Sequence, residues 1–496
     1  MLNAAPIPEL VLAAARDPAI RKRQALWTEE RCLDYQQLED AVAHAAGFLL
    51  DYGLKRGERV GLLTGRTATA ASAVLAVMAA GGAVCVLDER LPGAELEARL
   101  RTAGIGWILA DAEHYSLAEA ANPRALLRLE DAARARPRVV DDVRLDDDAL
   151  LVMTSGSTGH PKAVLLTHGN LLSNARGVVE RTDISPADRV LHNMPMHHTN
   201  GVNNQLIVPW ACGAAVVMLD HFRAETFFAE VHRHRPTYFT GVATHYSRLL
   251  AFTPPPGSLS SVRFARGGAA PLNAELHRKI EAHLGMPLVM SYGLSEATCT
   301  CTMNPPAARK VGTVGTALYG QRVAVFAPGT QEPVATNAEG EICIAGPSVM
   351  KGYVPAEAHA DGPSIRHGWL RTGDLGQLDA DGYLTVTGRL KDIIIRGGEN
   401  LSPGRIEEVL AAHTAVRACC VVGAPDADLG EVPVAFVTTN RGQSIPEREL
   451  KDQVASRLPP SWVPARVTVL DAMPENRVGK IDRQALKKLA AAAHGH

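Results

Sequence analysis

Apolar residues occur in short runs separated by helix-length stretches over most of the chain. The runs lie at 60–64, 83–87, 107–110, 190–194, 214–219, 238–241, 262–265 and 288–292. Such alternation is typical of largely parallel strands covered by helices. The pattern predicts an α/β protein with two such sheets, whose ligand-binding loops gather at the carboxyl ends of the strands.

One helix start is marked clearly. Asp34 and Gln37 have the spacing of a capping box, and apolar residues then recur at helical spacing over 38–49 until Gly53. The most apolar window, 70–87, is rich in alanine and contains a glycine pair. It predicts a packed helix followed by a buried strand, and not a membrane span.

The pattern changes in the last third of the chain. Short apolar runs separated by Gly, Pro and Asp predict a small β-rich subdomain over about 311–388. A compact α+β pattern follows, with strands at 393–396, 419–423 and 432–438, a helix at 403–412 and a final helix from Asp482. We therefore expect a large domain over 1–390 and a small domain over 391–496.

The composition of the chain limits the classes of molecule that it is expected to bind. The 496 residues include 51 Lys and Arg against 53 acidic residues, so no basic excess points to nucleic acid or an anionic membrane. The 8 cysteines have no paired framework spacing, and the first residues lack the basic start of an export signal. We expect a cytoplasmic protein whose partners are small molecules.

The segment from Met153 to Lys162 combines hydroxyl residues, glycines and one lysine between a predicted strand and a predicted helix. Glycines allow consecutive N–H groups to face an anion, hydroxyls add donors, and Lys162 supplies a charge. The spacing is not that of a P-loop. By itself the segment predicts either a polyphosphate site or a flexible surface loop.

Five further segments accompany it in order: Ser291–Glu296, Gly340–Ile342, Gly368–Asp374, Gly388–Asp392 and Asn476–Lys480. Together the six segments resemble those of the adenylate-forming superfamily, which includes acyl-CoA synthetases, adenylation domains and firefly-type luciferases. The resemblance covers nearly the whole chain. It implies a two-step reaction in which a carboxylate attacks the α-phosphorus of ATP and a thiol then attacks the acyl-adenylate, with ATP, Mg²⁺ and coenzyme A as cofactors.

The resemblance assigns the first segment to the leaving pyrophosphate. Ser157 stands where the family usually has Thr, and Ala163 where it usually has Gly. The phosphate-binding residues would be Thr154, Ser155, Gly156, Ser157, Thr158, Gly159 and Lys162.

By the same resemblance Glu296 and Thr158 would hold Mg²⁺, a cation that prefers oxygen ligands. Tyr292 would cover the adenine, Asp374 would bind both ribose hydroxyls, and Arg389 would reach the ribose or phosphate. The alternatives are a solvated glutamate, a core tyrosine, a turn aspartate and a surface salt bridge. Further nucleotide contacts are expected from Gly268, Ala269, Ala270, Gly293 and Ser295.

Lys480 would carry adenylation by bridging the substrate carboxylate and the α-phosphate. In the family the small domain then turns about a hinge, here at Lys391, and presents another face for thiol attack. That face would include Gly397, Gly398 and Glu399 as a passage for pantetheine, although a simple β-turn explains the glycine pair equally well.

The acyl substrate would lie against the segment Pro195–Gly201, with His198 as a catalytic gate and His197 beside it. No acidic or cysteine residue has a spacing suited to a metal site at this histidine pair. The remaining walls would be Asn200, Gly201, Gly241, Val242, Gly267, Gly268 and Gly293, whose mostly small side chains predict a roomy pocket.

The identity of the acid is less constrained. No aspartate lies at 199–202 to hold an ammonium group, so amino acids are not expected. Arg266 either recognises a second carboxylate, as in a short dicarboxylic acid, or is structural. We expect an apolar or aryl monocarboxylic acid.

Coenzyme A is the expected acceptor, and a separate carrier protein is the alternative. A non-catalytic nucleotide-binding protein of the same fold is a further alternative. Against it stand the five intact charged residues Lys162, Glu296, Asp374, Arg389 and Lys480.

Overall fold

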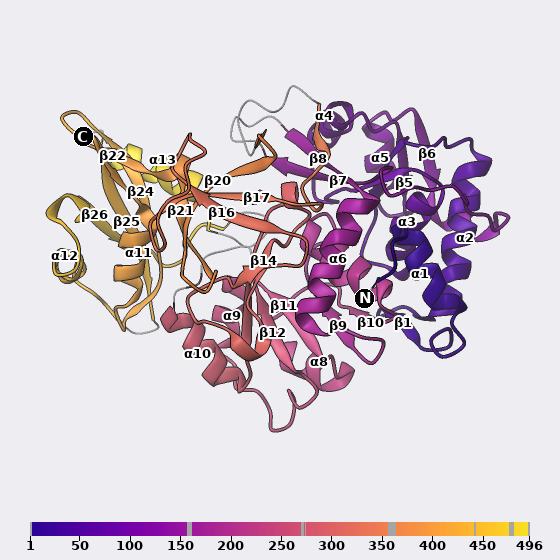
Figure 1. The fold of residues 1–496 in the computed structure, drawn as a ribbon, viewed down its shortest axis with the longest axis horizontal. Helices are drawn as coiled ribbons and strands as arrows, with labels where there is room; N and C mark the ends of the chain where they lie inside the picture. Colours follow the sequence, from indigo (N-terminus) through magenta and orange to yellow (C-terminus); the bar gives the residue numbers. More distant parts are fainter. Residues whose placement is uncertain are drawn as a thin grey trace.

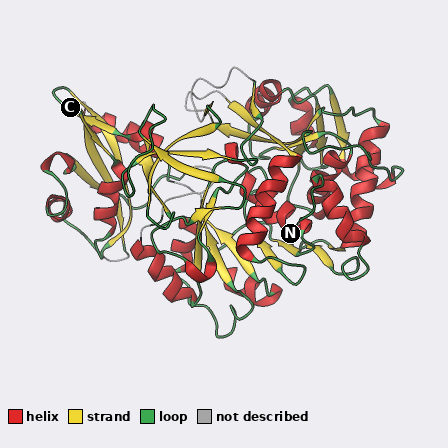
Figure 2. Ribbon diagram, viewed as in Figure 1, coloured by secondary structure: helices red, strands yellow, loops and turns green. Residues whose placement is uncertain are grey.

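The computed structural model describes residues 2–155, 161–268, 272, 274–355, 364–440, 443–475 and 481–494. Its first two thirds contain two sheets with helices between and around them (Figures 1 and 2). This confirms the predicted α/β class with two helix-covered, largely parallel sheets. Within the described ranges, no helix combines the length and apolar character needed to cross a membrane.

The larger sheet has nine strands, most of them parallel. In spatial order they are β15 (Thr316–Ala317), β14 (Thr302–Met303), β13 (Leu288–Tyr292), β12 (Phe264–Gly267), β11 (Tyr238–Gly241), β9 (Arg189–His192), β10 (Ala215–Met218), β1 (Gln24–Trp27) and β2 (Cys32–Asp34). β11 and β13 have the predicted bounds, whereas β12 begins two residues later than its apolar run. Three neighbouring strands, β11, β12 and β13, thus end at one edge.

The second sheet has seven strands. Their order is β18 (Gly352–Val354), β8 (Pro161–Thr167), β7 (Asp148–Ser155), β4 (Ala83–Val86), β3 (Arg59–Leu63), β5 (Trp107–Ala110) and β6 (Ala125–Arg128). One face packs against α4 (Gly93–Ala103) and α5 (Tyr115–Ala120). The other contributes to the largest core, shared with α1 (Ile7–Arg16), α2 (Tyr35–Asp51), α3 (Ala68–Ala79), α6 (His168–Thr182) and α7 (Val208–Ala211).

The capping box predicted at α2 is confirmed. Gln37 N–H donates to Asp34 Oδ1 at 2.7 Å, and Asp34 N–H donates to Gln37 Oε1 at 2.9 Å. Two orphan donors of the helix start are therefore satisfied.

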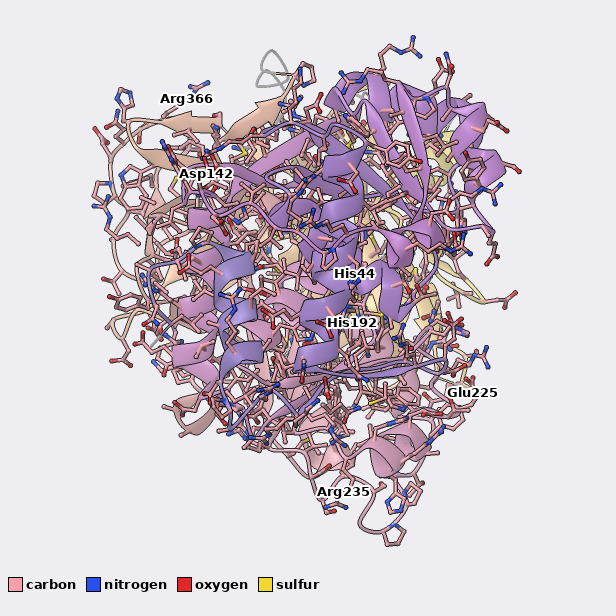
Figure 3. All side chains as sticks on the ribbon, turned by 90° about the vertical axis from the view of Figure 1, so that its right-hand side faces the viewer. His44, Asp142, His192, Glu225, Arg235 and Arg366 are labelled. Carbon is pink, nitrogen blue, oxygen red and sulfur yellow. The ribbon has the colours of Figure 1, made fainter. Side chains whose placement is uncertain are left out.

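A partly buried arginine connects the two sheets. Arg66, just after β3, donates to the carbonyls of Met194 and Leu219 and contacts the ring of His192 at 2.8 Å. His192 ends β9 and is labelled in Figure 3, which also shows charged side chains such as Glu225 and Arg235 at the outside. Burial lowers the pKa of Arg66 to about 10.

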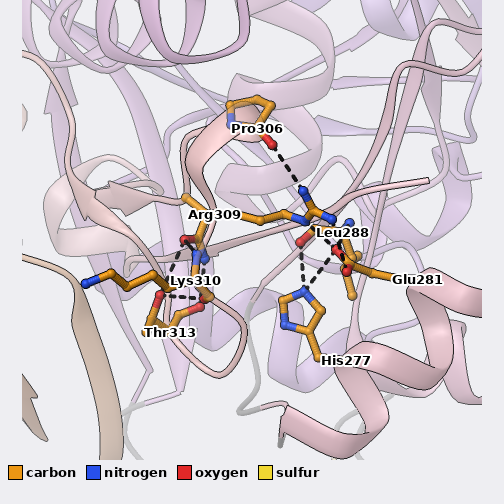
Figure 4. Close-up of polar contacts among 8 residues, drawn as sticks. His277, Glu281, Leu288, Pro306, Arg309, Lys310 and Thr313 are labelled. Atoms are coloured by element: carbon orange, nitrogen blue, oxygen red, sulfur yellow. Dashed lines mark hydrogen bonds and ion pairs between the residues drawn. The ribbon is translucent and has the colours of Figure 1, made fainter.

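The outer face of the nine-stranded sheet carries α8 (Phe227–His234), α9 (Ala243–Leu249) and α10 (Ala274–Leu284). α10 also fixes the start of β13. Leu288 N–H donates to Glu281 at 2.7 Å, the ring of His277 contacts Leu288 O at 3.0 Å, and Arg309 holds Glu281 (Figure 4).

A five-stranded antiparallel sheet follows, as predicted for the β-rich segment. It comprises β16 (Arg322–Phe326), β17 (Gly340–Ala345), β20 (Trp369–Leu378), β19 (Ser364–Arg366) and β21 (Leu384–Arg389). The last part of the chain, coloured orange to yellow at the left of Figure 1, has its own core. Its elements are β22 (Ile394–Arg396), β23 (Glu399–Leu401), α11 (Pro403–Ala411), β24 (Val416–Asp426), β25 (Gly430–Thr439), α12 (Glu447–Ala455), β26 (Arg466–Val469) and α13 (Arg483–His494).

The start of α6 buries a histidine. Thr167 and Asn170 form a second capping box, and the Asn170 amide donates to Pro347 O and Val349 O at 2.9 Å each. His168 lies in this first turn with 1% of its surface exposed. Burial lowers the pKa of His168 to about 4, and Asp147 and Asp148 offset only part of that shift.

Because the folded pKa of His168 lies below its usual 6.5, the unfolded chain takes up the proton first as the pH falls. The stability that neutral His168 contributes is thus complete above pH 6.5 and is lost toward pH 4. We expect the free energy of unfolding, measured in urea, to fall between pH 7 and pH 4 by about 3 kcal/mol less in His168→Gln than in wild type. The exposed His232→Gln is the control; a His168→Gln pH profile parallel to wild type would contradict the assignment.

Candidate active site

The predicted phosphate segment connects two antiparallel strands. Thr154 of β7 pairs with Lys162 of β8, and α6 begins only at His168. The prediction that this segment leads from a strand into a helix is therefore wrong. The apolar run Ala163–Leu166 continues as strand until Thr167 caps the helix. Gly156, Ser157, Thr158 and Gly159 lie outside the described residues, as does the side chain of Ser155.

Lys162 is buried, with 7% exposed, and its Nζ lies 3.8 Å from the ring centroid of Tyr353. Tyr353 belongs to β18, which pairs with β8, and its hydroxyl donates to Glu296 Oε1 at 2.7 Å. A tyrosine that the sequence motifs did not single out thus connects the predicted phosphate lysine to the predicted metal carboxylate. Burial, followed by the charge of Glu296, raises the pKa of Tyr353.

Glu296 lies in the 3₁₀ turn η3 (Ser295–Ala297), four residues after the end of β13. It is 6% exposed, and its carbonyl accepts from Met350 N–H at 2.8 Å. The alternative of a solvated glutamate is therefore wrong. The carboxylate accepts one hydrogen bond from Tyr353, which leaves acceptor capacity for a hard cation. The donor chemistry fits Mg²⁺.

Asp374 joins the other two predicted nucleotide residues. Tyr292 Oη donates to Asp374 Oδ2 at 2.7 Å, and Arg389 Nε lies 2.9 Å from Asp374 Oδ1. Asp374 and Arg389 face each other across β20 and β21, while Tyr292 ends β13. Burial, followed by the charge of Asp374, raises the pKa of Tyr292 well above its usual range. Arg389, 56% exposed at its side chain, forms the salt bridge that was its alternative role.

Gly293 lets the chain turn back immediately after β13. A Cβ at this position would lie 1.8 Å from the carbonyl oxygen of Cys299, which is a backbone atom. The returning segment is fixed when Cys301 N–H donates to Tyr292 O at 2.8 Å. Gly268, at the end of β12, is also close to its neighbour, since its Cβ would lie 3.0 Å from Ser291 Oγ. Ala269 and Ala270 lie outside the described residues.

The predicted histidine pair is in contact. The rings of His197 and His198 have centroids 4.5 Å apart, and His197 Nε2 lies 3.9 Å from Asp88 Oδ2. The expectation that no acidic residue could share a metal site with His197 is wrong, because the loop after β4 brings Asp88 and Glu89 within reach of it. Burial lowers the pKa of His197 and Asp88 offsets part of this shift, while Asp88 itself also binds Arg90.

The segment after the histidines forms η2 (Asn200–Ile207), a π-helix. A Cβ on Gly201 would lie 2.1 Å from the carbonyl oxygen of Pro195, so only glycine fits. The buried Asn200 Oδ1 has no hydrogen-bond partner within the described structure.

Small residues do not by themselves give free volume here. A Cβ on Gly241 would lie 2.9 Å from the ring of Tyr246, and a Cβ on Gly267 would lie 2.4 Å from Met290 Sδ. Both glycines make room for neighbouring protein side chains. Val242, the next predicted wall residue, is buried with 2% exposed.

The predicted hinge and thiol passage lie at the start of the last part of the chain. Lys391 is exposed in the 3₁₀ turn η6 (Leu390–Asp392). Gly397 and Gly398 have φ of 56° and 86° and form the two-residue turn between β22 and β23. Glu399 follows, and its Oε1 accepts from Trp462 Nε1 at 2.9 Å. At this glycine pair the backbone therefore adopts the simple β-turn that was the alternative to a passage for pantetheine.

Lys480 lies outside the described residues, but its flanks are fixed. Glu475 and Ile481 form an antiparallel bridge, and Arg248 of α9 donates to Glu475 Oε2 at 2.7 Å. This ion pair ties the flank of the predicted catalytic segment to the large sheet.

The chain is similar to known proteins in both sequence and fold. Residues 13–354 match the AMP-binding enzyme family, and residues 405–480 match the AMP-binding enzyme C-terminal domain. The chain is 34% identical over 456 residues to a feruloyl-CoA synthase of an Amycolatopsis species, covering 90% of this chain and 92% of that protein.

Two solved structures resemble the whole fold. ATP-bound MatB from Rhodopseudomonas palustris has a TM-score of 0.90 at 28% identity, covering 98% of this chain and 99% of that one. The o-succinylbenzoate CoA synthetase of Bacillus subtilis, in complex with its acyl-adenylate intermediate, has a TM-score of 0.85 at 29% identity, with coverage of 98% and 99%.

Replacing Gly293 with alanine should disrupt the site, because its Cβ would meet backbone that cannot move independently. We expect Gly293→Ala to lower the free energy of unfolding by roughly 3 kcal/mol and to weaken ATP binding. Gly352→Ala on β18 is the matched control, since a Cβ there has nothing within 4 Å. Equal melting temperatures for the two variants would refute this account.

Proposed function

The chain belongs to the AMP-binding enzyme family, and from this premise we propose how its residues divide the reaction between them. The enzyme is an ATP-dependent acid–thiol ligase. A carboxylate displaces pyrophosphate from ATP to give acyl-AMP, and the thiol of coenzyme A then displaces AMP to give acyl-CoA. Mg²⁺ accompanies the ATP.

One observation supports the assignment most strongly: the five residues from Tyr292 to Glu296 connect two clusters. At one end Tyr292 contacts Asp374, which pairs with Arg389. At the other end Glu296 contacts Tyr353, which packs on Lys162. Ribose and phosphates of one nucleotide need an acceptor group and a cationic group at such neighbouring positions.

The first step brings two anions together, so positive charge must dominate at the phosphates. Lys162 faces the pyrophosphate, and Glu296 would hold Mg²⁺, whose charge would stabilise the leaving group. Tyr292 covers the adenine, and Asp374 accepts from the ribose hydroxyls in place of its present donors. His198 closes the acyl side, and Lys480 bridges the carboxylate and the α-phosphate.

The boundary between the domains lies at about residue 390, and the small domain turns about Lys391 between the two steps. We assign the arrangement in which Arg248 pairs with Glu475 to the adenylation step, because this contact holds Glu475, which flanks the predicted catalytic segment, against α9. After the turn, Gly397, Gly398 and Glu399 face the adenylate. A cytoplasmic location is part of the proposal, because the eight cysteines lack the spacing of a disulfide framework.

The relatives named above act on different acids, so their names do not decide the acid here. A panel of carboxylic acids, assayed for pyrophosphate release and followed by mass analysis with and without coenzyme A, tests the function. We expect release with at least one acid and acyl-CoA only when coenzyme A is present. An acyl-adenylate that reacts with a carrier protein but not with coenzyme A would favour the carrier alternative. ATP binding without release by any acid would favour a binding protein.

Lys480→Ala should abolish ATP–pyrophosphate exchange, by on the order of 100-fold or more, because it removes the cation that stabilises the charge between carboxylate and α-phosphate. Thioester formation from preformed acyl-adenylate should stay within a few-fold of wild type. The exposed Lys488→Ala, eight residues further along, is the control. Loss of both half-reactions in Lys480→Ala would refute this division of labour.

A further inference from the structure

Arg266 is a fully buried cation in the middle of the larger sheet. It lies on β12 between Thr240 of β11 and Val289 of β13, and only 2% of its surface is exposed. An arginine side chain keeps its charge at any physiological pH, so it cannot avoid the cost of burial by losing a proton. A charge in this position needs a partner.

The described part of the chain satisfies only part of the Arg266 side chain. Its Nη2 donates to Thr300 Oγ1 at 2.7 Å, whereas Nε and Nη1 have no hydrogen-bond partner. The groups that act on its charge are the thiol of Cys299 and the hydroxyls of Tyr238 and Tyr246, and none of them is a carboxylate. No described carboxylate pairs with this guanidinium.

The surroundings of Arg266 are polar and also incompletely satisfied. Thr300 Oγ1 accepts a second hydrogen bond from Asn204 at 2.8 Å, and Asn204 belongs to η2. The buried hydroxyls of Tyr238 and Thr240, on the neighbouring strand, have no partner within the described structure. In folded proteins, buried hydrogen-bond donors of this kind are rarely left without a partner.

These groups adjoin the predicted acyl region. Gly267 and Gly268 follow Arg266 directly, and Asn200 and Gly201 begin the same π-helix that carries Asn204. Thr300 follows Cys299, whose carbonyl lies against Gly293 at the turn that leads to Glu296. The cation is thus placed among the elements that meet the acid, one strand away from those that meet the nucleotide.

We propose that Arg266 determines specificity by pairing with a second anionic group of the acid substrate, a carboxylate or a sulfonate distal to the carboxylate that is activated. Nε and Nη1 form the two-pronged donor that such an oxyanion accepts, and the Tyr238 and Thr240 hydroxyls supply further donors. This inference rests on the proposed function of the same site. It replaces the expectation of an apolar or aryl monocarboxylic acid.

The test compares acids that differ only in the second charge. Malonate, succinate and glutarate are assayed for pyrophosphate release beside their monomethyl esters and the monoacids of equal carbon number. Sulfoacetate and 3-sulfopropionate separate a sulfonate from a carboxylate. We expect kcat/KM for the best dianion to exceed that of its ester and its monoacid by on the order of 100-fold, as for loss of one partner of a buried charged pair.

Arg266→Met removes the charge at similar volume and should fold, because an uncompensated buried charge is removed. We expect it to lose the preference for the dianion by a similar factor while monoacid activity holds or rises, and Arg266→Lys to keep an intermediate preference. A dianion should also raise the melting temperature of wild type and Arg266→Lys but not of Arg266→Met.

Monoacids used as well as or better than dianions by wild type would overturn the inference while leaving the ligase function intact. An unchanged ratio of dianion to monoacid activity in Arg266→Met would also overturn it, since it would make Arg266 structural. Pyrophosphate release with no acid of either class would instead refute the proposed function. If Arg266→Met does not fold, the wild-type preference and Arg266→Lys decide the question.

Discussion

The chain has to reverse direction immediately after β13, and the site depends on that reversal. Gly293 permits it because the carbonyl of Cys299 occupies the space where any Cβ would lie. On one side of the turn Tyr292 reaches Asp374, and on the other Glu296 reaches Tyr353. The strand itself is held at its start by Glu281 and His277, so both ends of β13 are fixed. Because β13 is fixed at its start and turns sharply at its end, Tyr292 and Glu296 are held at a constant separation.

Buried charge is distributed unevenly over this frame. Arg66 donates hydrogen bonds to the carbonyls of Met194 and Leu219, which follow strands of the larger sheet, and Lys162 packs on the ring of Tyr353. Both cations therefore have contacts that replace part of their hydration. Arg266 keeps two unpaired nitrogens in the described structure. Burial of an incompletely paired cation destabilises the free protein, and the anionic substrate group proposed above would offset this penalty on binding.

Sequence alone predicted the elements that depend on local pattern. The bounds of β11 and β13 and the capping box at Asp34 follow from apolar runs and from one polar pair. It failed where a contact crosses between elements. Nothing along the chain indicated that β18 would place Tyr353 between Lys162 and Glu296, or that Asp88 would approach His197. The strand β8 was not predicted, because hydroxyl and glycine residues before Lys162 are typical of a loop, whereas the aliphatic run after Lys162 forms a strand in the fold.

If Asp374 binds the ribose as proposed, its contacts couple nucleotide binding to the proposed domain boundary. A carboxylate has two oxygens, and here one accepts from Tyr292 and the other from Arg389. A ribose whose two hydroxyls bind the same oxygens competes with both donors. Arg389 is the last residue of β21, and the turn with Lys391 follows directly. Since the Arg389 side chain is more than half exposed, little free energy is lost when it leaves Asp374. In the proposed reaction the released guanidinium then reaches the phosphate. Under the proposed assignment, occupancy of the ribose position and the conformation of the boundary are linked by this one salt bridge.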